Sequence, residues 1–190
     1  AGRGPAMKRT WFTSDTHFNH EAVIRYSDRP WPDADAMNRA LISRWNTLVR
    51  PGDDVWHLGD FAMGDRKRIP ELLAALRGNI TLVTGNHDFA RDDKYFARVM
   101  RGKRFVVWVD GVPLQLAHNP AHVLPDADAL VALCGHVHEA WAEKPAGAVL
   151  GRELRSGAEL VAPMRIINVG VDVRRFRPAL LDELLWRDEL

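Results

Sequence analysis

The chain has 190 residues, enough for one domain with a sizeable hydrophobic core. Apolar residues make up 46% and charged residues 27%, as in ordinary globular proteins, and the formal net charge of +1 excludes a strongly basic nucleic-acid binder. The single cysteine, Cys134, excludes an intramolecular disulfide and a thiolate-rich metal site. No apolar run approaches the roughly 18 residues of a membrane span. We therefore expect one cytoplasmic domain over residues 7–190, with no membrane partner and with residues 1–6 left over from expression.

Strand and helix patterns alternate in the first half of the chain. Trp, Phe and Thr residues predict a strand over 9–14, and helical spacing of apolar residues predicts a helix over 34–50 that Pro51-Gly52 stops. Short apolar runs predict strands over 55–58 and 80–83, with a helix over 68–76 between them.

The second half is mostly β. Asp110-Gly111 predicts a hairpin between strands over 104–109 and 112–117. Further strands are expected over 130–133, 148–150, 160–161 and 165–169, followed by a final helix over 179–186. This order predicts an α/β protein with two packed β-sheets and helices on the outside.

Polar side chains follow five of these predicted strands. In chain order they are Asp15 and His17; Asp60; Asn86, His87 and Asp88; His118; and His136 with His138. In open α/β sheets, binding sites form at the carboxyl ends of the strands. Glycines beside Asp60, Asn86 and His136 allow sharp turns and close backbone approach there. We therefore expect these side chains to share one site.

The donors at these strand ends contain oxygen and nitrogen but no sulfur: Asp15, His17, Asp60, Asn86, His118, His136 and His138. One ion takes about four to six ligands, so a shared carboxylate would let this set hold two ions about 3.5–4 Å apart, as in two-metal hydrolases. Imidazole mixed with carboxylate favours Mn, Fe, Zn, Co or Ni over Ca or Mg, and Mn is our first expectation. Such ions lower the pKa of bound water, which makes hydroxide available as a nucleophile. Their residual positive charge suits an anionic phosphate ester.

Other polar residues receive simpler interpretations. His87 is expected to act as a general acid or as a donor to phosphate, with Asp88 orienting its imidazole. His20 follows the first group closely and could line a phosphate pocket. His57, inside a strand, is interpreted as structural, and Arg29 as exposed, although its guanidinium could reach a phosphate. Basic clusters at 66–68, 101–104 and 174–177 are interpreted as solvated surface.

The ordered blocks resemble a known signature. "DTH" (15–17), "GD" (59–60), "GNHD" (85–88), the isolated His118 and "GHVH" (135–138) are similar, in this order, to the calcineurin-like metallophosphoesterases. The tail over 167–184 resembles the closing segment of small bacterial members. The resemblance implies two mixed β-sheets packed face to face between helices, a four-layer sandwich.

The resemblance also implies roles for the site residues. Asp15, His17, Asp60 and His138 would bind one ion; Asp60 would bridge; and Asn86, His118 and His136 would complete the second site. Asn86 and His87 would contact the phosphate, and His87 would assist departure of the leaving group.

Three functional hypotheses follow. The first is a dinuclear metal-dependent phosphoesterase that acts on phosphodiesters in preference to monoesters, with nucleotides among its candidate substrates. The second is a DNA or RNA nuclease that uses the same site. The third is a non-catalytic binding module, which the presence of His87 disfavours because such modules lose site residues. The physiological substrate, the native metal and the oligomeric state stay open at this stage.

Overall fold

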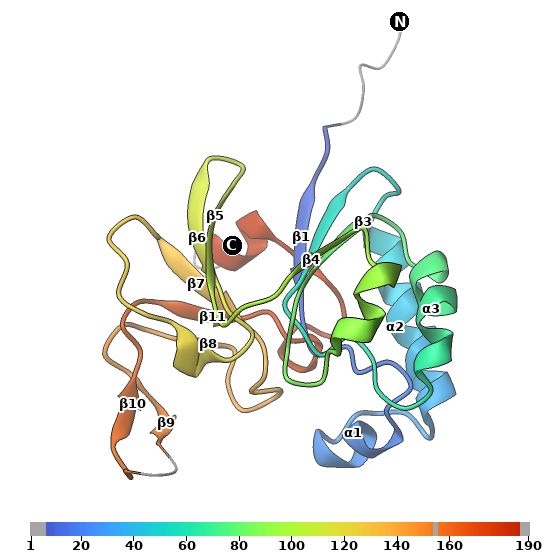
Figure 1. Ribbon diagram of the computed structural model, residues 1–190, viewed down its shortest axis with the longest axis horizontal. Helices are drawn as coiled ribbons and strands as arrows, with labels where there is room; N and C mark the ends of the chain where they lie inside the picture. Colours follow the sequence, from blue (N-terminus) through green and yellow to red (C-terminus); the bar gives the residue numbers. More distant parts are fainter. Residues whose placement is uncertain (1–6, 154–155, 187–190) are drawn as a thin grey trace, which may run out of the picture.

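Two five-stranded mixed sheets form the centre of the protein (Figure 1). This computed structural model describes residues 7–153 and 156–186, so the expected expression remnant lies outside the described residues. The strand orders are β12-β1-β2-β3-β4 and β5-β6-β7-β11-β8, and a separate two-stranded hairpin, β9–β10, projects from the side of the second sheet.

The first sheet carries the helices. Its strands are β1 (Thr10–Thr13), β2 (Asp54–His57), β3 (Asn79–Val83), β4 (Arg98–Met100) and β12 (Ala179–Leu180). The helices are α1 (Glu21–Tyr26), α2 (Ala34–Leu48) and α3 (Ile69–Ala75), with the 3-10 turns η1 (Arg66–Arg68) and η2 (Ala90–Tyr95). Asp33 begins α2 by accepting the Ala36 N–H at 2.7 Å. Strands β1 to β4 run parallel, and β12 pairs antiparallel with β1.

The second sheet is built from later segments of the chain. Its strands are β5 (Phe105–Val109), β6 (Val112–Leu116), β7 (Val131–Cys134), β8 (Glu143–Lys144) and β11 (Ile166–Asn168). The remaining elements are β9 (Val149–Arg152), β10 (Glu159–Val161), η3 (Pro120–His122), η4 (Val171–Val173) and α4 (Leu181–Leu185). Strands β6, β7 and β11 run parallel to one another.

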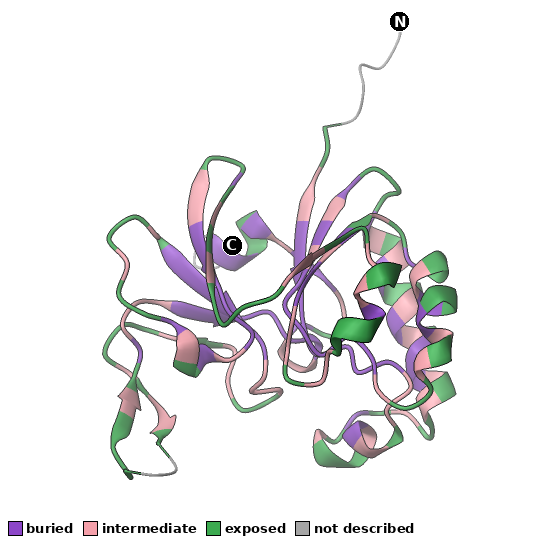
Figure 2. Ribbon diagram, viewed as in Figure 1, coloured by how far each residue is buried: buried purple, intermediate pink, exposed green. Residues whose placement is uncertain are grey.

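The buried residues form layers on the strands (Figure 2). Along β1, Trp11 belongs to the cluster under α2 and α3, whereas Phe12 belongs to the cluster between the sheets, because successive strand residues face opposite sides. Leu181 and Leu184 of α4 add to the core between the sheets. On the outer face of the second sheet, Ala132 packs in a third cluster with Val123 and Ala162.

The α/β fold with two packed mixed sheets is confirmed, with three local differences. The structure adds α1, β4 and β8. The segment expected as one helix over 179–186 instead begins with β12, because Ala179 and Leu180 pair with Phe12 and Trp11 at the edge of the first sheet. The third cluster on the second sheet is covered by η3 and loops, so helices flank mainly the first sheet. No helix in the described part of the chain is long and apolar enough to cross a membrane.

Parallel strands place their carboxyl ends together. Strands β1, β2 and β3 end at one edge of the first sheet, and β6, β7 and β11 end at one edge of the second. A bridge between Ser14 and Gly170 joins the end of β1 to the end of β11. The two edges therefore meet, and residues that follow six different strands share one region.

Candidate metal centre

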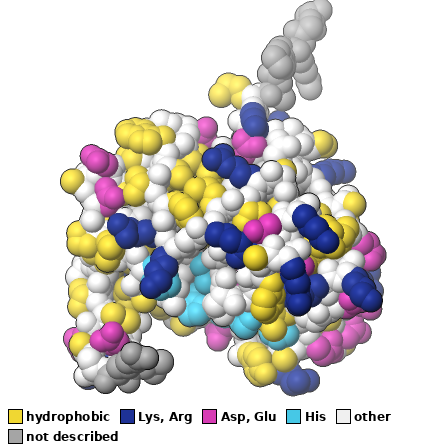
Figure 3. All heavy atoms as spheres, in the orientation of Figure 1, with side chains coloured by type: hydrophobic (Ala, Val, Ile, Leu, Met, Phe, Trp, Pro, Cys, Tyr) yellow, Lys and Arg dark blue, Asp and Glu magenta, His cyan; other side chains and the backbone are white. Residues whose placement is uncertain are grey.

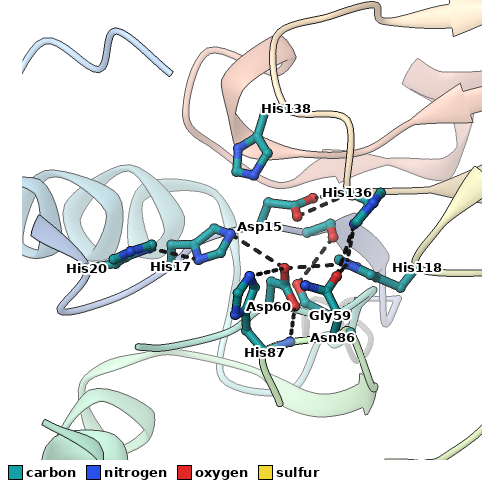
Figure 4. A network of polar contacts seen from close by, with 12 residues as sticks. Asp15, His17, His20, Gly59, Asp60, Asn86, His87, His118, His136 and His138 are labelled. Atoms are coloured by element: carbon teal, nitrogen blue, oxygen red, sulfur yellow. Dashed lines mark hydrogen bonds and ion pairs between the residues drawn. The ribbon is translucent and has the colours of Figure 1, made fainter. Parts of the chain in front are cut away.

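The predicted donors gather at this meeting edge (Figure 4). The first sheet supplies Asp15 and His17 after β1, Asp60 after β2, and Asn86 with His87 after β3. The second sheet supplies His118 after β6, and His136 with His138 after β7. All of the expected ligands therefore lie in one cluster, contributed by both sheets.

The first group of donors consists of Asp15, His17 and His138. One ligand atom from each lies within 4.8 Å of the others, close enough for all three to reach one ion. The imidazoles of His17 and His138 stack with their ring centroids 5.1 Å apart. Asp15 is fully buried, and His17 is 2% exposed.

The second group is centred on the oxygen of a carboxamide. Asn86 Oδ1 lies 3.0 Å from His118 Nε2 and 3.0 Å from His136 Nδ1, and the two ring nitrogens are 3.3 Å apart. Asp15, Asp60 and His118 also offer ligand atoms within 4.8 Å of one another. Asp60, Asn86, His118 and His136 could together hold a second ion.

Asp60 lies between the two groups. Its Oδ2 is 3.6 Å from His17 Nε2 on one side and 3.4 Å from His118 Nε2 on the other. Its Oδ1 accepts the backbone N–H of His87 at 2.9 Å, which fixes the carboxylate and leaves Oδ2 facing both groups. This is the geometry that a bridging carboxylate requires.

The backbone is strained at these donors. Asp15, His17, Asp60, His136 and His138 all have positive φ, from 45° to 72°. Such a conformation is unfavourable for residues other than glycine, and it persists where the surrounding structure enforces it, most often at functional sites. The sharp turns after β1, β2 and β7 therefore aim these side chains into the cluster.

Two glycines make the close approach of the loops possible. A Cβ on Gly135 would lie 2.0 Å from Ser14 Oγ and 2.3 Å from Asp15 Oδ2. A Cβ on Gly85 would lie 2.2 Å from Asp60 Oδ1. Only residues without a Cβ fit at these positions. In the space beside Gly135, the His136 N–H donates to both oxygens of Asp15, at 3.1 and 2.9 Å.

A buried ion pair holds His138 in place. His138 Nδ1 lies 2.9 Å from Asp172 Oδ2, which leaves Nε2 for the cluster. Arg29 donates to both oxygens of Asp172, at 2.7 and 2.9 Å, and to the carbonyl oxygens of Asp15 and Thr16, at 2.7 and 3.0 Å. The expectation that Arg29 is exposed is wrong: it is 4% exposed, because it joins Asp172 to the loop after β1.

His20 contacts His17 on the side of its ring that faces away from Asp60. The two Nδ1 atoms are 3.2 Å apart, so one ring donates to the other and His17 Nε2 is directed towards Asp60. That Nε2 is buried and has no hydrogen-bond partner among the described residues. An unpartnered buried nitrogen is costly unless a ligand uses its lone pair. The donor set therefore fits a divalent cation, which would bind at this atom.

The electrostatics of the cluster agree with a cation. Burial lowers the pKa of His17 to about 2, which keeps its imidazole neutral and able to coordinate a metal. Burial also opposes a charge on His118, but Asp60 and Asp15 outweigh it and raise the pKa of His118 to about 9. The carboxylates thus attract positive charge into the cluster. His118 Nδ1 lies 2.8 Å from the carbonyl oxygen of Leu58, so Nε2 faces the other donors.

His87 and Asp88 have separate roles in the geometry. His87 Nε2 lies 4.0 Å from Asp60 Oδ2, and its side chain is 39% exposed at the edge of the cluster. The carboxylate of Asp88 takes a different position from the one expected. It accepts the backbone N–H groups of Asp60, Phe61 and Gly85, at 2.8, 3.1 and 2.8 Å. Asp88 therefore ties the turn after β2 to the turn after β3, and the geometry shows it supporting the loops instead of the imidazole.

Comparisons with known proteins identify the family of the chain. The family model described as the calcineurin-like phosphoesterase superfamily domain matches residues 9–170. An uncharacterized protein of Methanocaldococcus jannaschii is 32% identical over 181 residues, which cover 93% of this chain and 89% of that protein. The gene 66 protein of Mycobacterium phage L5 is 33% identical over 85 residues, or 43% of this chain and 41% of that protein.

A solved structure agrees with the fold. A protein of unknown function from Aquifex aeolicus superposes with a TM-score of 0.67 at 21% identity, covering 93% of this chain and 97% of that chain. At this level of identity the likeness concerns the fold alone.

Proposed function

Because the chain belongs to the calcineurin-like phosphoesterase superfamily, we propose that it is a phosphoesterase that uses two divalent metal ions and prefers phosphodiesters to monoesters. The observation that supports this most is Asp60 Oδ2, which lies 3.6 Å from His17 Nε2 and 3.4 Å from His118 Nε2. A carboxylate oxygen between two groups of ligands is the arrangement that two neighbouring ions require.

The ligands divide between the two groups. Asp15, His17, Asp60 and His138 would hold one ion, and Asp60, Asn86, His118 and His136 would hold the other. Imidazole nitrogens mixed with carboxylate and carboxamide oxygens suit Mn, Fe, Zn, Co or Ni, and we propose Mn first. When bound, such ions supply Lewis acidity and a nucleophile at neutral pH.

The protein's own groups would position the substrate. His87 has its backbone fixed, since its N–H donates to Asp60 Oδ1 at 2.9 Å. Its imidazole stands at the exposed edge of the cluster, within reach of a phosphate at the centre. There it can donate to a phosphoryl oxygen and transfer a proton to the departing alkoxide or phenoxide. Asn86 lies beside it and could contact the same phosphate.

A metal-by-substrate activity matrix tests the proposal. The purified protein would be loaded with Mn²⁺, Ni²⁺, Co²⁺ or Fe²⁺ and assayed on bis-p-nitrophenyl phosphate, p-nitrophenyl phosphate and 2′,3′-cyclic nucleotides. We expect turnover with Mn²⁺ that is faster on the diesters. Faster turnover of the monoester would contradict the diester preference, and no turnover with any metal would contradict the enzymatic function.

The His87→Ala variant tests the role of the imidazole. We expect it to keep its bound metal and to lose at least about 100-fold in kcat, the usual contribution of a general acid. The His122→Ala variant, which changes a histidine on η3, is the matched control and should keep its activity. Loss of metal from His87→Ala would show that His87 is a ligand and would overturn its assigned role.

A further inference from the structure

A positively charged pocket lies beside the candidate metal centre, between η1 and η2. Its volume is about 400 Å³, within the range of small-molecule sites. Four cationic and two acidic side chains line it, and the full lining is Gly64, Asp65, Arg66, Lys67, Arg91, Asp92, Lys94 and Tyr95.

The acidic residues of this pocket are already engaged. Asp92 pairs with Arg66 at 2.5 Å, and Asp65 caps η1 by accepting the backbone N–H of Lys67 at 3.1 Å. In residues 7–153 and 156–186, the side chains of Lys67, Arg91 and Lys94 form no ion pair with a carboxylate. Three exposed cations therefore line the pocket without an ion-pair partner among the described residues.

Aromatic rings accompany the cations. Phe89 lies under two guanidinium groups, with Arg66 at 4.4 Å and Arg91 at 5.1 Å from its ring centroid. Tyr95 lies 5.0 Å from the Lys94 ammonium, and both rings are partly exposed, Phe89 by 48% and Tyr95 by 37%. Cations beside exposed aromatic faces are the combination that binds phosphates and stacks bases in nucleotide sites.

Arg66 connects this pocket to the metal centre. Two of its guanidinium nitrogens lie 3.4 and 3.5 Å from the carbonyl oxygen of His87. One wall of the pocket thus touches the residue that would meet the scissile phosphate. Figure 3 shows the histidines as a band on one face of the molecule, with Lys and Arg side chains beside them.

We propose that this pocket binds a second phosphate group of the substrate, so that the preferred substrates are nucleotide phosphodiesters that carry a phosphate beyond the scissile one. This inference rests on the proposed phosphoesterase function. Within the basic cluster at 66–68, it assigns to Lys67 a binding role in place of a solvated surface. Lys67, Arg91 and Lys94 would bind the phosphate, and Tyr95 or Phe89 would contact the base.

The test compares two substrates that differ by one phosphate. The Mn²⁺-loaded enzyme would hydrolyse thymidine 5′-(p-nitrophenyl phosphate) with and without a 3′-phosphate. We expect KM to be about tenfold lower for the 3′-phosphorylated substrate, as a net gain of one charge-assisted contact predicts. In a variant that combines Lys67→Ala, Arg91→Ala and Lys94→Ala, this difference should disappear.

A charge-matched control separates the pocket from the overall charge. The combined variant Arg39→Ala, Arg50→Ala and Arg152→Ala removes three exposed cations outside the pocket and should keep the tenfold difference. Equal KM values for the two substrates in the wild type, or an equal loss in both combined variants, would overturn the proposal.

A binding measurement separates the pocket from the chemistry. Isothermal titration with thymidine 3′,5′-bisphosphate and with thymidine 5′-monophosphate should show tighter binding of the bisphosphate that depends on the three pocket cations. If that result appears in a protein without turnover, the proposed function is contradicted, whereas phosphate binding in the pocket is supported. If the protein hydrolyses diesters but binds both nucleotides equally, the pocket proposal alone fails.

Discussion

The two donor groups of the candidate centre are held by different kinds of partner. Behind the first group, His138 is bound to Asp172, which is bound in turn to Arg29, and both partners are buried side chains. Behind the second group, His118 is bound to the backbone carbonyl of Leu58. The first group thus depends on a network of charged side chains, and the second depends on the course of the main chain.

This difference affects how each donor group responds to mutation. A buried Arg–Asp pair is sensitive to loss of either partner, because the remaining charge is left uncompensated. A backbone carbonyl group remains in place when the side chain of the same residue is substituted. The second group also contains the exposed Asn86, whereas Asp15 and His17 in the first are buried. We therefore expect the first group to be more rigid, and more easily damaged by mutations away from the ligands.

The largest effect on metal binding should come from Asp60, the residue that the two donor groups share. Asp60→Asn removes the charge between His17 and His118, so we expect both ions to be lost, with metal affinity lower by more than about 100-fold, beyond the effect of an outer hydrogen-bond partner. Metal analysis after dialysis measures this. If the variant retains one tightly bound ion, Asp60 is a ligand in only one of the two donor groups.

A close backbone contact should give the next largest effect. The new Cβ in Gly135→Ala would meet Ser14 Oγ at 2.0 Å and Asp15 Oδ2 at 2.3 Å, so the loop or the carboxylate must move. A displacement of about 1 Å can cost about 100-fold in rate, and we expect a loss of this size in kcat. Gly52→Ala is the control, because its Cβ meets nothing within 4 Å and its backbone, like that of Gly135, does not have a positive φ. Equal activity of the two variants would show that the approach to Asp15 is unimportant.

Asp172→Asn should weaken metal binding at the first donor group alone. It removes the charge that pairs with Arg29 and keeps an oxygen near His138, and we expect affinity for one of the two ions to fall about tenfold, as for other outer partners of metal-bound histidines. Titration of metal-free protein with Mn²⁺ measures both affinities, and Asp182→Asn, an exposed change in α4, is the matched control. An equal loss of affinity for both ions would contradict the distinction between the two donor groups.

The smallest effect should come from His20→Ala. His20 is only partly buried, and it supports His17 through a single contact of 3.2 Å. Water can replace this contact, so we expect metal affinity to fall by no more than about threefold, in keeping with the small value of exposed polar pairs. The same Mn²⁺ titration measures it. A loss as large as that of Asp172→Asn would show that both outer partners of the first group are equally important.

Much of this arrangement could be predicted from the sequence. Polar residues after apolar runs indicated the ends of β1, β2, β3, β6 and β7, and parallel strands bring such ends together. The family resemblance is confirmed by the match over residues 9–170. The fold's main elements follow from hydrophobic periodicity, which is strong in buried strands and long helices.

Other parts could not be predicted, for physical reasons. Arg29 and Asp172 are 143 positions apart, and nothing local indicates that they form a buried pair. Asp172 does follow a strand, β11, so the same rule would have found it. The two-residue β12 exists only through its pairing with β1, and a two-residue strand has no periodicity. The adjacency of His87 and Asp88 predicts a contact between the Asp88 carboxylate and the imidazole, whereas the turn directs this carboxylate to backbone N–H groups.

The number and position of bound metal ions test the central claim most directly. Crystals of the Mn²⁺-loaded protein, measured at the manganese absorption edge, should show two anomalous peaks about 3.5–4 Å apart, one at each donor group with Asp60 between them. A single peak, or peaks away from Asp15, Asp60 and His118, would contradict the proposed two-metal centre.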